Sequence, residues 1–263
     1  TVGGVVWHRT LRAAGLGAIG LPAALRAHWI CRGASELLPL QIGEAARVVA
    51  LRREPAANGA TWRVIGSIAA MKLLDVAVTL PLVALILVVI IDPDPGLMAM
   101  LVGLALAVVA VGILVRRGAG LLRLIPARAR DAASQMSGGA AVLRSGRALT
   151  GLWSLQAVST VLRIAGIGAL LVASGAPLMS APAVFALLAV TGLVPLVPGG
   201  AGVREAAVVP LLVGMYGLGL DTALAASLAV QAVALGVAMA GAGIAMAGRA
   251  RVALPLEPAP SPV

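Results

Sequence analysis

Long apolar stretches separated by short polar segments run along most of the chain, and their lengths predict membrane helices. Leu97–Val115 is a run of 19 residues without a charge. At about 1.5 Å per residue it nearly crosses a hydrocarbon core of roughly 30 Å. Trp62–Ile91, Gly151–Ala173 and Asp221–Ala247 are also long enough. The pattern therefore predicts an all-α, polytopic transmembrane helix bundle, with Leu97–Val115 as its clearest span.

Two further apolar pieces are too short to be complete spans. Ala183–Val197 and Ala206–Leu220 hold about 15 residues each, whereas a spanning helix needs about 20. They meet at a Gly/Pro break that contains Pro198, Gly199, Gly200 and Gly202. We expect a re-entrant hairpin of two half-length helices. Irregular backbone at membrane depth is tolerated only where it is buried in protein or lines a polar cavity, so the break is a candidate site.

A weak internal repeat accompanies this break. Leu37–Ala46, which contains Pro39, Gly43 and Glu44, shares with Leu193–Ala207 the order apolar, Pro, Gly, Glu, helix. The helix after Glu44 is expected to run toward the cytoplasm and the helix after the second motif away from it. Opposite directions are typical of an inverted-topology repeat with its site near the midplane. A chance match in an Ala/Leu-rich chain is the alternative.

Composition and charge support a membrane protein and exclude several other classes. Hydrophobic residues make up 60% of the 263 residues, charged residues 11%, and the mean hydropathy is +1.04. A soluble domain carries roughly 25% charged residues. The net charge of +10 would suggest nucleic acid in a soluble protein, but six aromatic residues make base stacking implausible. One Cys and two His exclude an intrachain disulfide and a Cys/His zinc site. We expect no cofactor and no bound metal.

The arginines predict the orientation of the chain. Seven Arg fall in the loop Arg116–Thr150, which the positive-inside rule assigns to the cytoplasm. The loop Asp92–Gly96 is then outside. We expect one transmembrane domain over residues 1–263, with a Pro-rich tail at 252–263. Residues 1–34 stay uncertain, because Leu11–Leu25 could be an earlier span or an interfacial helix; the start at Thr1 suggests an incomplete N-terminus.

Charges inside the expected spans are the main candidate functional residues, because such charges are costly and are usually paired or functional. Lys72 and Asp75 lie three residues apart on one helical face. They form either an internal ion pair or the polar wall of a lipid head-group cavity. Arg163 either pairs with Asp75 or Glu205 across the bundle or binds a phosphate directly.

Charges also begin the helix that follows each Pro/Gly motif. Glu44 and Arg47 lie three apart at a helix start, where a Glu either complements the helix dipole or belongs to a site. Arg204 and Glu205 follow the glycines directly. Free backbone N–H groups and an Arg would suit a phosphate, and a tight turn that needs small residues is the alternative. Farther along, Gly236, Gly241 and Gly243 indicate close helix packing.

Three motifs in order resemble the lysylphosphatidylglycerol synthase transmembrane (flippase-like) family. They are Glu36–Arg47, Lys72–Asp75 and Pro198–Glu205, and the resemblance covers roughly Ser35–Arg251. The family pattern is Pro…Gly-Glu-x-x-Arg, then Arg-x-x-Asp, then Pro-Gly-Gly-x-Gly-Val-x-Glu. Members include the lipid-translocating half of aminoacyl-phosphatidylglycerol synthases and proteins linked to polyprenyl-glycan or hopanoid pathways.

The sequence departs from that pattern at four positions. Glu36 stands where Asn is expected, Gln41 where a basic residue is expected and Lys72 where Arg is expected, and Gln231 occupies a position that is often Arg. These changes leave fewer strongly basic side chains at the expected site than the family pattern has. Whether the protein selects an anionic head group therefore stays open. Because no soluble aminoacyltransferase domain is present, the resemblance does not imply synthesis of an aminoacyl lipid.

The resulting hypothesis is an inner-membrane protein of a bacterium that binds or translocates an amphipathic lipid, either phosphate-bearing or of polyprenyl or hopanoid type. No nucleophile triad, metal site or nucleotide motif supports an enzyme. One alternative is a membrane-embedded transferase or phosphatase that acts on a polyprenyl phosphate through Glu44, Asp75 or Glu205. Another is an accessory subunit without transport of its own. Membrane lipids are the expected partners, nucleic acid is not, and a homo-oligomer or a partner enzyme of a lipid or glycan pathway stays open.

The topology can be tested with introduced cysteines. Cysteines placed between Arg116 and Arg147 should not react with an impermeant thiol reagent in intact cells, whereas one placed near Asp94 should react, because the arginines hold their loop inside. The opposite labelling pattern would overturn the orientation and with it the inverted repeat.

Overall fold

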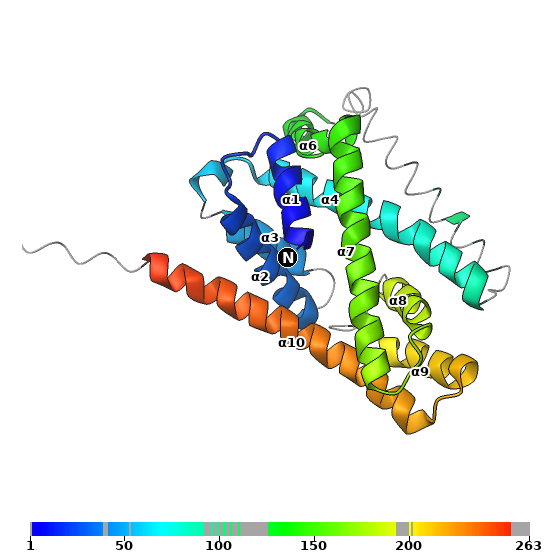
Figure 1. The fold of residues 1–263 in the computed structure, drawn as a ribbon. Helices are drawn as coiled ribbons and strands as arrows, with labels where there is room; N and C mark the ends of the chain where they lie inside the picture. Colours follow the sequence, from blue (N-terminus) through cyan, green and yellow to red (C-terminus); the bar gives the residue numbers. More distant parts are fainter. Residues whose placement is uncertain are drawn as a thin grey trace, which may run out of the picture.

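The computed structural model describes residues 2–38, 42–52, 54–91, 126–192, 200 and 202–253, with single positions 96, 99, 102, 103, 106 and 110. These residues form helices and turns with no β-strand among them, which confirms the all-α class (Figure 1). The α-helices are α1 (Val2–Ala13), α2 (Leu21–Leu37), α3 (Ile42–Leu51), α4 (Thr61–Ile86), α6 (Ala127–Gly139), α7 (Gly146–Ala173), α8 (Ser180–Thr191), α9 (Val203–Tyr216) and α10 (Leu220–Ala253). Short helical pieces are η1 (Pro55–Ala57), η2 (Leu87–Ile91, a π-helix that continues α4) and η4 (Ala141–Arg144).

Within the described residues, three helical stretches are long and apolar enough to cross a membrane. They are Thr61–Val89, Gly146–Ala173 and Leu220–Gly248. These confirm three of the four predicted spans. The fourth, Leu97–Val115, lies outside the described residues apart from five single positions. The second span begins five residues before the predicted Gly151, because Ser145 caps α7 by accepting the N–H of Ala148 at 3.4 Å.

The first part of the chain differs from the prediction of one apolar piece at Leu11–Leu25. Helix α1 ends at Ala13, the chain turns through Gly15 at φ +77°, and α2 begins at Leu21. Trp7 and Leu11 are completely buried. Helix α1 therefore packs into the bundle through its apolar side, against α2, α4 and α7.

The described part of the arginine-rich segment is mainly helical, whereas the sequence predicts a loop at Arg116–Thr150. Its described part, from residue 126 on, contains α6 and η4 and then enters α7. Helix α6 packs on the start of α4 through two glycines. A Cβ on Gly66 would overlap the carbonyl oxygen of Met136, and one on Gly139 would overlap that of Arg63. The two backbones thus touch directly, which only residues without a side chain allow.

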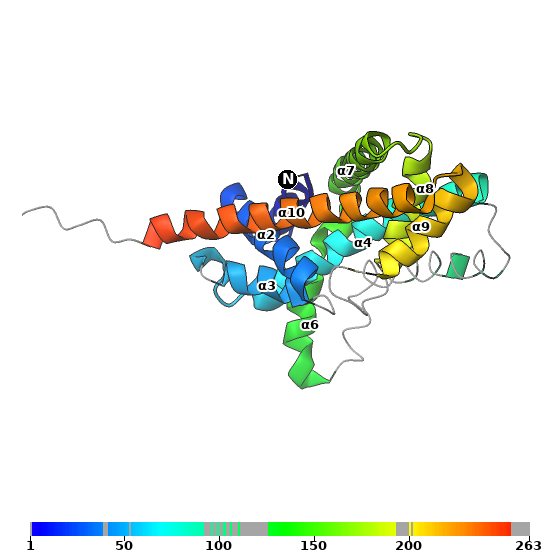
Figure 2. The same ribbon diagram turned by 90° about the horizontal axis from the view of Figure 1, so that it is seen from below.

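Two helical hairpins lie along α10, one near its start and one at its middle, where Gly241 and Ala242 meet α2. Helices α2 and α3 pack side by side, and so do α8 and α9 (Figure 2). The hydroxyl of Tyr216, at the end of α9, donates to the carbonyl oxygen of Met179, just before α8, at 3.3 Å. The α8–α9 hairpin therefore leaves the bundle on the side where it entered. With 12 and 14 residues, its helices are half-length, as the re-entrant prediction requires.

The apolar core is divided along the long helices. One cluster joins α1, α2, α3, α4 and the start of α7, up to Leu74 and Leu155. The others join the far ends of α4 and α7 to α8, α9 and α10, from Val76 and Ile164 onward. Helices α4 and α7 run through both halves, and α10 lies along both (Figures 1 and 2). The region where the clusters meet carries polar side chains on both α4 and α7. We call it the seam, and its residues are Lys72 and Asp75 on α4 and Gln156 and Arg163 on α7.

Glycines in α10 contribute less to packing than predicted. A Cβ on Gly241 would overlap the ring of Trp29 on α2, so this glycine brings the two helices together. Gly236 and Gly243 face open space, where a side chain would meet nothing within 4 Å. The expectation of close packing is correct for Gly241 and wrong for the other two.

The contact between α4 and α6 predicts a large effect of one methyl group. Gly66→Ala should destabilise the protein by about 1–3 kcal/mol, because the new Cβ overlaps a backbone atom that cannot yield easily. Gly236→Ala is the matched control in open space and should be neutral or stabilising by up to about 1 kcal/mol. Thermal unfolding of both purified variants in detergent measures the difference, and equal melting temperatures would contradict the direct contact.

Candidate functional site

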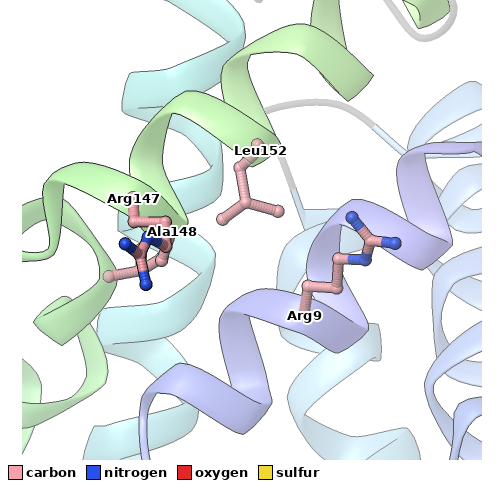
Figure 3. Close-up of a pocket in the computed structure, with 6 residues that line it drawn as sticks. Arg9, Arg147, Ala148 and Leu152 are labelled. Carbon is pink, nitrogen blue, oxygen red and sulfur yellow. The ribbon is translucent and has the colours of Figure 1, made fainter.

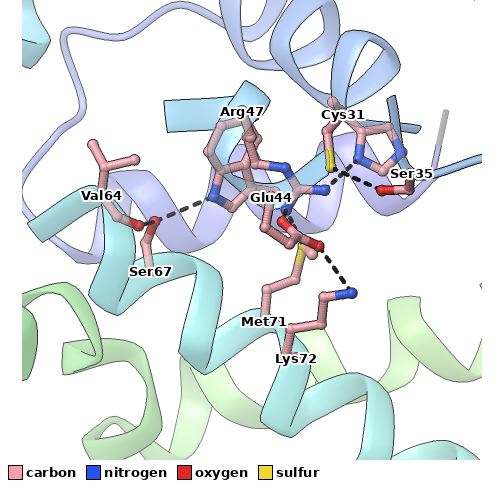
Figure 4. A network of polar contacts seen from close by, with 10 residues as sticks. Cys31, Ser35, Glu44, Arg47, Val64, Ser67, Met71 and Lys72 are labelled. Atoms are coloured by element: carbon pink, nitrogen blue, oxygen red, sulfur yellow. Dashed lines mark hydrogen bonds and ion pairs between the residues drawn. The ribbon is translucent and has the colours of Figure 1, made fainter. Parts of the chain in front are cut away.

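Arg47 occupies the centre of a polar cluster, at 2% exposure. It lies in α3, and its guanidinium reaches side chains of four helices (Figure 4). Its Nη1 lies 3.4 Å from Glu44 Oε2 and 3.6 Å from the Met71 sulfur, and its Nη2 donates to His28 Nδ1 at 3.3 Å. The same guanidinium stacks 4.6 Å from the centre of the Trp7 ring, which is a cation–π contact. Arg47 thus ties together α1, α2, α3 and α4.

Glu44 links this buried arginine to a more open cation. One carboxylate oxygen faces Arg47, and the other lies 2.9 Å from Lys72 Nζ. The Glu44 side chain is 18% exposed, whereas that of Lys72 is 48% exposed. Lys72 therefore has room for a further ligand beside the carboxylate that holds it (Figure 4).

Trp7 and Ser67 fix the wall behind Arg47. The indole N–H of Trp7 donates to the Ser67 hydroxyl at 3.2 Å, and this hydroxyl donates to the carbonyl oxygen of Val64 at 2.7 Å. Both side chains are completely buried. The ring that stacks on Arg47 is thus held in place by a hydrogen bond to α4, so the guanidinium has a fixed position.

A second charged group lies on α4 and α7. Asp75 Oδ1 lies 3.6 Å from Arg163 Nη1, and it also accepts a hydrogen bond from the Gln156 amide. Gln156 is buried, whereas the Arg163 side chain is 48% exposed. Lys72 and Asp75 each have their partner on another helix, so the predicted ion pair within α4 is wrong. The predicted pairing of Arg163 with Asp75 across the bundle is confirmed.

A third charged group joins the two hairpins where their helices turn. Glu36, near the end of α2, lies 3.5 Å from Arg32 and 3.9 Å from Arg204, in the first turn of α9. Arg204 Nε is buried and makes no hydrogen bond to any described residue. The side chain of Arg204 lies over Gly200, which has φ +71°; a Cβ there would come within 2.8 Å of Nε. Arg204 therefore has one donor, its Nε–H, that no described residue accepts at the contact between the hairpins.

Glu205 has a local role in the structure. Its carboxylate accepts the backbone N–H of Gly202 at 2.6 Å and so satisfies a free donor at the start of α9. Gly202, at φ +81°, has the backbone conformation that glycine adopts readily. Of the two alternatives for this motif, the tight capped turn accounts for Glu205, while Arg204 turns toward the other hairpin.

Together the three groups place more positive than negative charge at the seam and the adjoining hairpin ends. Five cationic side chains, Arg32, Arg47, Lys72, Arg163 and Arg204, face three carboxylates, Glu36, Glu44 and Asp75. With Glu205, whose carboxylate caps α9 one residue after Arg204, the excess among these described side chains is one positive charge, which favours an anionic ligand. No group of three metal-ligating side chains occurs among the described residues. The guanidinium and ammonium groups can bind an anion electrostatically and through charge-assisted hydrogen bonds.

The predicted site residues fall into three classes. The structure brings Gly43, Glu44, Arg47, Lys72, Asp75, Arg163, Gly200 and Arg204 to the charged groups or to the hairpin that carries them. Gly202 and Glu205 form the local cap. Pro39, Pro198 and Gly199 lie outside the described residues. For Gly43 the structure gives a packing role, because a Cβ there would overlap the Ser35 hydroxyl and lie 2.7 Å from the carbonyl oxygen of Cys31.

Sequence reasoning did not assign Trp7, His28 or Gln156 to the site. Gln156 and Arg163 lie seven residues apart on one face of an apolar helix, and this spacing could have identified the pair. Trp7 and His28 give no such signal, because neither interrupts an apolar run and their contact with Arg47 depends on how α1 and α2 pack against α3.

The family model described as lysylphosphatidylglycerol synthase TM region matches residues 2–242. This confirms the resemblance and extends it through α1, whose Trp7 contacts the buried arginine. No curated protein matches the chain, and no solved structure does.

The pairing of Asp75 with Arg163 can be tested by a double-mutant cycle. Asp75→Leu should cost roughly 1–3 kcal/mol, less than for a fully buried pair, because it leaves Arg163 without its carboxylate. Adding Arg163→Leu should recover most of that loss, whereas adding Lys72→Leu should not, since Lys72 pairs with Glu44. Thermal unfolding in detergent measures each variant. Recovery by the Lys72 change instead would show that the pair within α4 is the real one.

Proposed function

Because the chain belongs to the lysylphosphatidylglycerol synthase TM family, we propose that it binds an amphipathic lipid through an anionic, phosphate-bearing head group and moves that lipid across the membrane. The observation that carries the proposal is the excess of cations at the seam, with Lys72 and Arg163 half exposed. We further propose the cell membrane of a bacterium as its location, with the arginine-rich side facing the cytoplasm.

The charges support a ligand because they exceed what the bundle needs for neutrality. If the protein alone neutralised these cations, each would need its own carboxylate to offset the cost of removing its charge from water. Here Glu44 serves both Arg47 and Lys72, and Glu36 serves both Arg32 and Arg204. A phosphate group would supply the missing negative charge and accept the donors that these shared carboxylates leave free.

The exposure of Lys72 and Arg163 suits reversible binding. Each keeps one carboxylate partner and has close to half of its side chain free. A phosphate could therefore bind without breaking the bundle, and the carboxylate would hold the cation again after the lipid leaves. Binding that is favourable yet weak enough for release is what transport requires.

The two hairpins support movement rather than static binding. Their ends meet through Glu36 and Arg204 at 3.9 Å, a loose ion pair between two separately packed units. Half-helices that meet near a site at membrane depth are typical of alternating-access transporters. In the proposed mechanism, the head group passes along the charged seam while its acyl chains stay in the lipid.

The enzymatic alternative finds less support in the geometry. Glu44 and Asp75 are held in ion pairs, and Glu205 caps α9, so each of the three candidate acid/base carboxylates already has a structural partner. A chemically altered lipid after incubation with the pure protein would nevertheless favour that class. An inert protein that only recruits another enzyme would show neither transport nor turnover.

Transport can be measured in vesicles with a fluorescent lipid and an impermeant quencher. Arg204→Ala should lower the apparent affinity for an anionic lipid by about tenfold or more, because it removes charge-assisted hydrogen bonds. A neutral lipid should be affected less. Gly200→Val should abolish transport, because it strains the positive-φ position and displaces Arg204.

Arg26→Ala is the matched control for the loss of one arginine. Arg26 pairs with Glu54 at 3.3 Å, and its side chain is 34% exposed, but it contacts none of the three charged groups. This variant should transport as well as the wild type. Unchanged transport of the anionic lipid by both Arg204→Ala and Gly200→Val, with insertion confirmed, would overturn the proposal.

A further inference from the structure

A separate cavity lies at the arginine-rich end of the bundle, between α1 and the start of α7. Its volume is about 180 Å³, and it is lined by Arg9, Val142, Arg147, Ala148, Gly151 and Leu152 (Figure 3). It shares no residue with the charged groups at the seam. The two arginines come from different helices, 138 positions apart in sequence, so the cavity exists only because α1 packs against η4 and α7.

The arginines of this cavity differ from those of the seam because no carboxylate holds them. Neither Arg9 nor Arg147 lies within salt-bridge distance of an acidic side chain among the residues that the structure describes. Both are exposed at the rim. Two guanidinium groups without a counter-charge beside one cavity favour an anion with several acceptor oxygens.

The floor of the cavity is apolar. Val142 and Leu152 are 1% and 3% exposed and belong to the core cluster that contains α1. Gly151 opens the cavity further, because a Cβ there would meet nothing within 4 Å. Of the apolar lining, Ala148 and Gly151 remain accessible, so the glycerol and first acyl carbons of a lipid would bury apolar area there, which a small inorganic anion would not.

Tryptophans place the cavity at the depth of lipid head groups. Trp153 follows Leu152 directly and is 49% exposed, and Trp62, in the first turn of α4, is 46% exposed. Exposed tryptophans of membrane helices gather at the head-group level. Arg147 lies six residues before Trp153, about 9 Å toward water at the helical rise. The guanidinium groups therefore stand where lipid phosphates lie.

We propose that this cavity binds the phosphodiester head group of an anionic glycerophospholipid from the arginine-rich leaflet. Arg9 on α1 and Arg147 on α7 lie on either side of Leu152 (Figure 3); both are exposed side chains that can turn to the phosphate, and the glycerol backbone covers Ala148 and Gly151. The site is independent of the proposed transport, because a resident lipid here would join α1 to α7 whatever passes along the seam. It adds a counter-charge to Arg9 and Arg147, which no carboxylate of the described residues pairs with.

The test is a binding titration of the purified, delipidated protein in detergent at fixed ionic strength. The probes are short-chain phosphatidylglycerol, short-chain phosphatidylcholine and inorganic phosphate. The wild type should bind phosphatidylglycerol at least tenfold more tightly than either other probe. Arg9→Gln with Arg147→Gln should lower this affinity by about tenfold or more, because two charge-assisted contacts are lost.

A matched pair controls for overall charge. Arg12 and Arg52 are exposed arginines outside the cavity, and Arg12 lies on the same helix as Arg9. Changing both to Gln removes the same two charges and should leave the affinity within about twofold of the wild-type value. An equal loss in this control would overturn the proposal in favour of general charge attraction.

Gly151→Leu gives a second test that changes no charge. The leucine would fill the open space beside Leu152 and should abolish binding of phosphatidylglycerol, while the helix keeps or gains stability. Binding that persists in this variant would overturn the cavity as the site. Equal affinity for inorganic phosphate would show a free-anion site, and equal affinity for phosphatidylcholine would show that the arginines do not select the head group; either result overturns the proposal. Transport in vesicles is measured separately. A protein that does not transport lipid along the seam can therefore still show, or fail to show, lipid binding in this cavity.

Discussion

The burial of one guanidinium constrains the arrangement of the N-terminal half of this protein. Arg47 is almost completely buried, so the bundle can hold its charge only by surrounding it with acceptors and a π-face. Those groups come from α1, α2, α3 and α4, through Trp7, His28, Glu44 and Met71. Each helix is therefore fixed relative to α3 by a contact that would be costly to lose.

The position of Arg47 determines which oxygen of the Glu44 carboxylate is left for Lys72. Since Glu44 is shared between the two cations, the buried one takes one carboxylate oxygen and the exposed one takes the other. Asp75 repeats the arrangement one turn farther along α4, with Gln156 as its buried partner and Arg163 as its exposed one. In both groups a buried partner fixes the carboxylate, and the carboxylate holds a cation that remains open to a ligand.

The seam and the cavity beside α1 would use cations in different ways. Along the seam the exposed cations are already paired, so a ligand must compete with carboxylates and binding stays reversible. In the cavity Arg9 and Arg147 have no such competitor among the described residues. The same head-group chemistry would be held there more persistently. This contrast separates a site suited to passage from a site suited to a resident lipid.

The sequence by itself determined the class of protein, three of its spans and the positions of its half-length helices, because apolar length is a local property that the bilayer fixes. It also identified Lys72, Asp75 and Arg163, since a charge inside an apolar run is visible without a structure. It could not determine their partners. Helical spacing suggested a pair within α4, but only helix packing placed Glu44 and Arg163 within reach. The cavity and the contacts of Arg47 were likewise decided by tertiary structure, because they join residues that are distant in sequence.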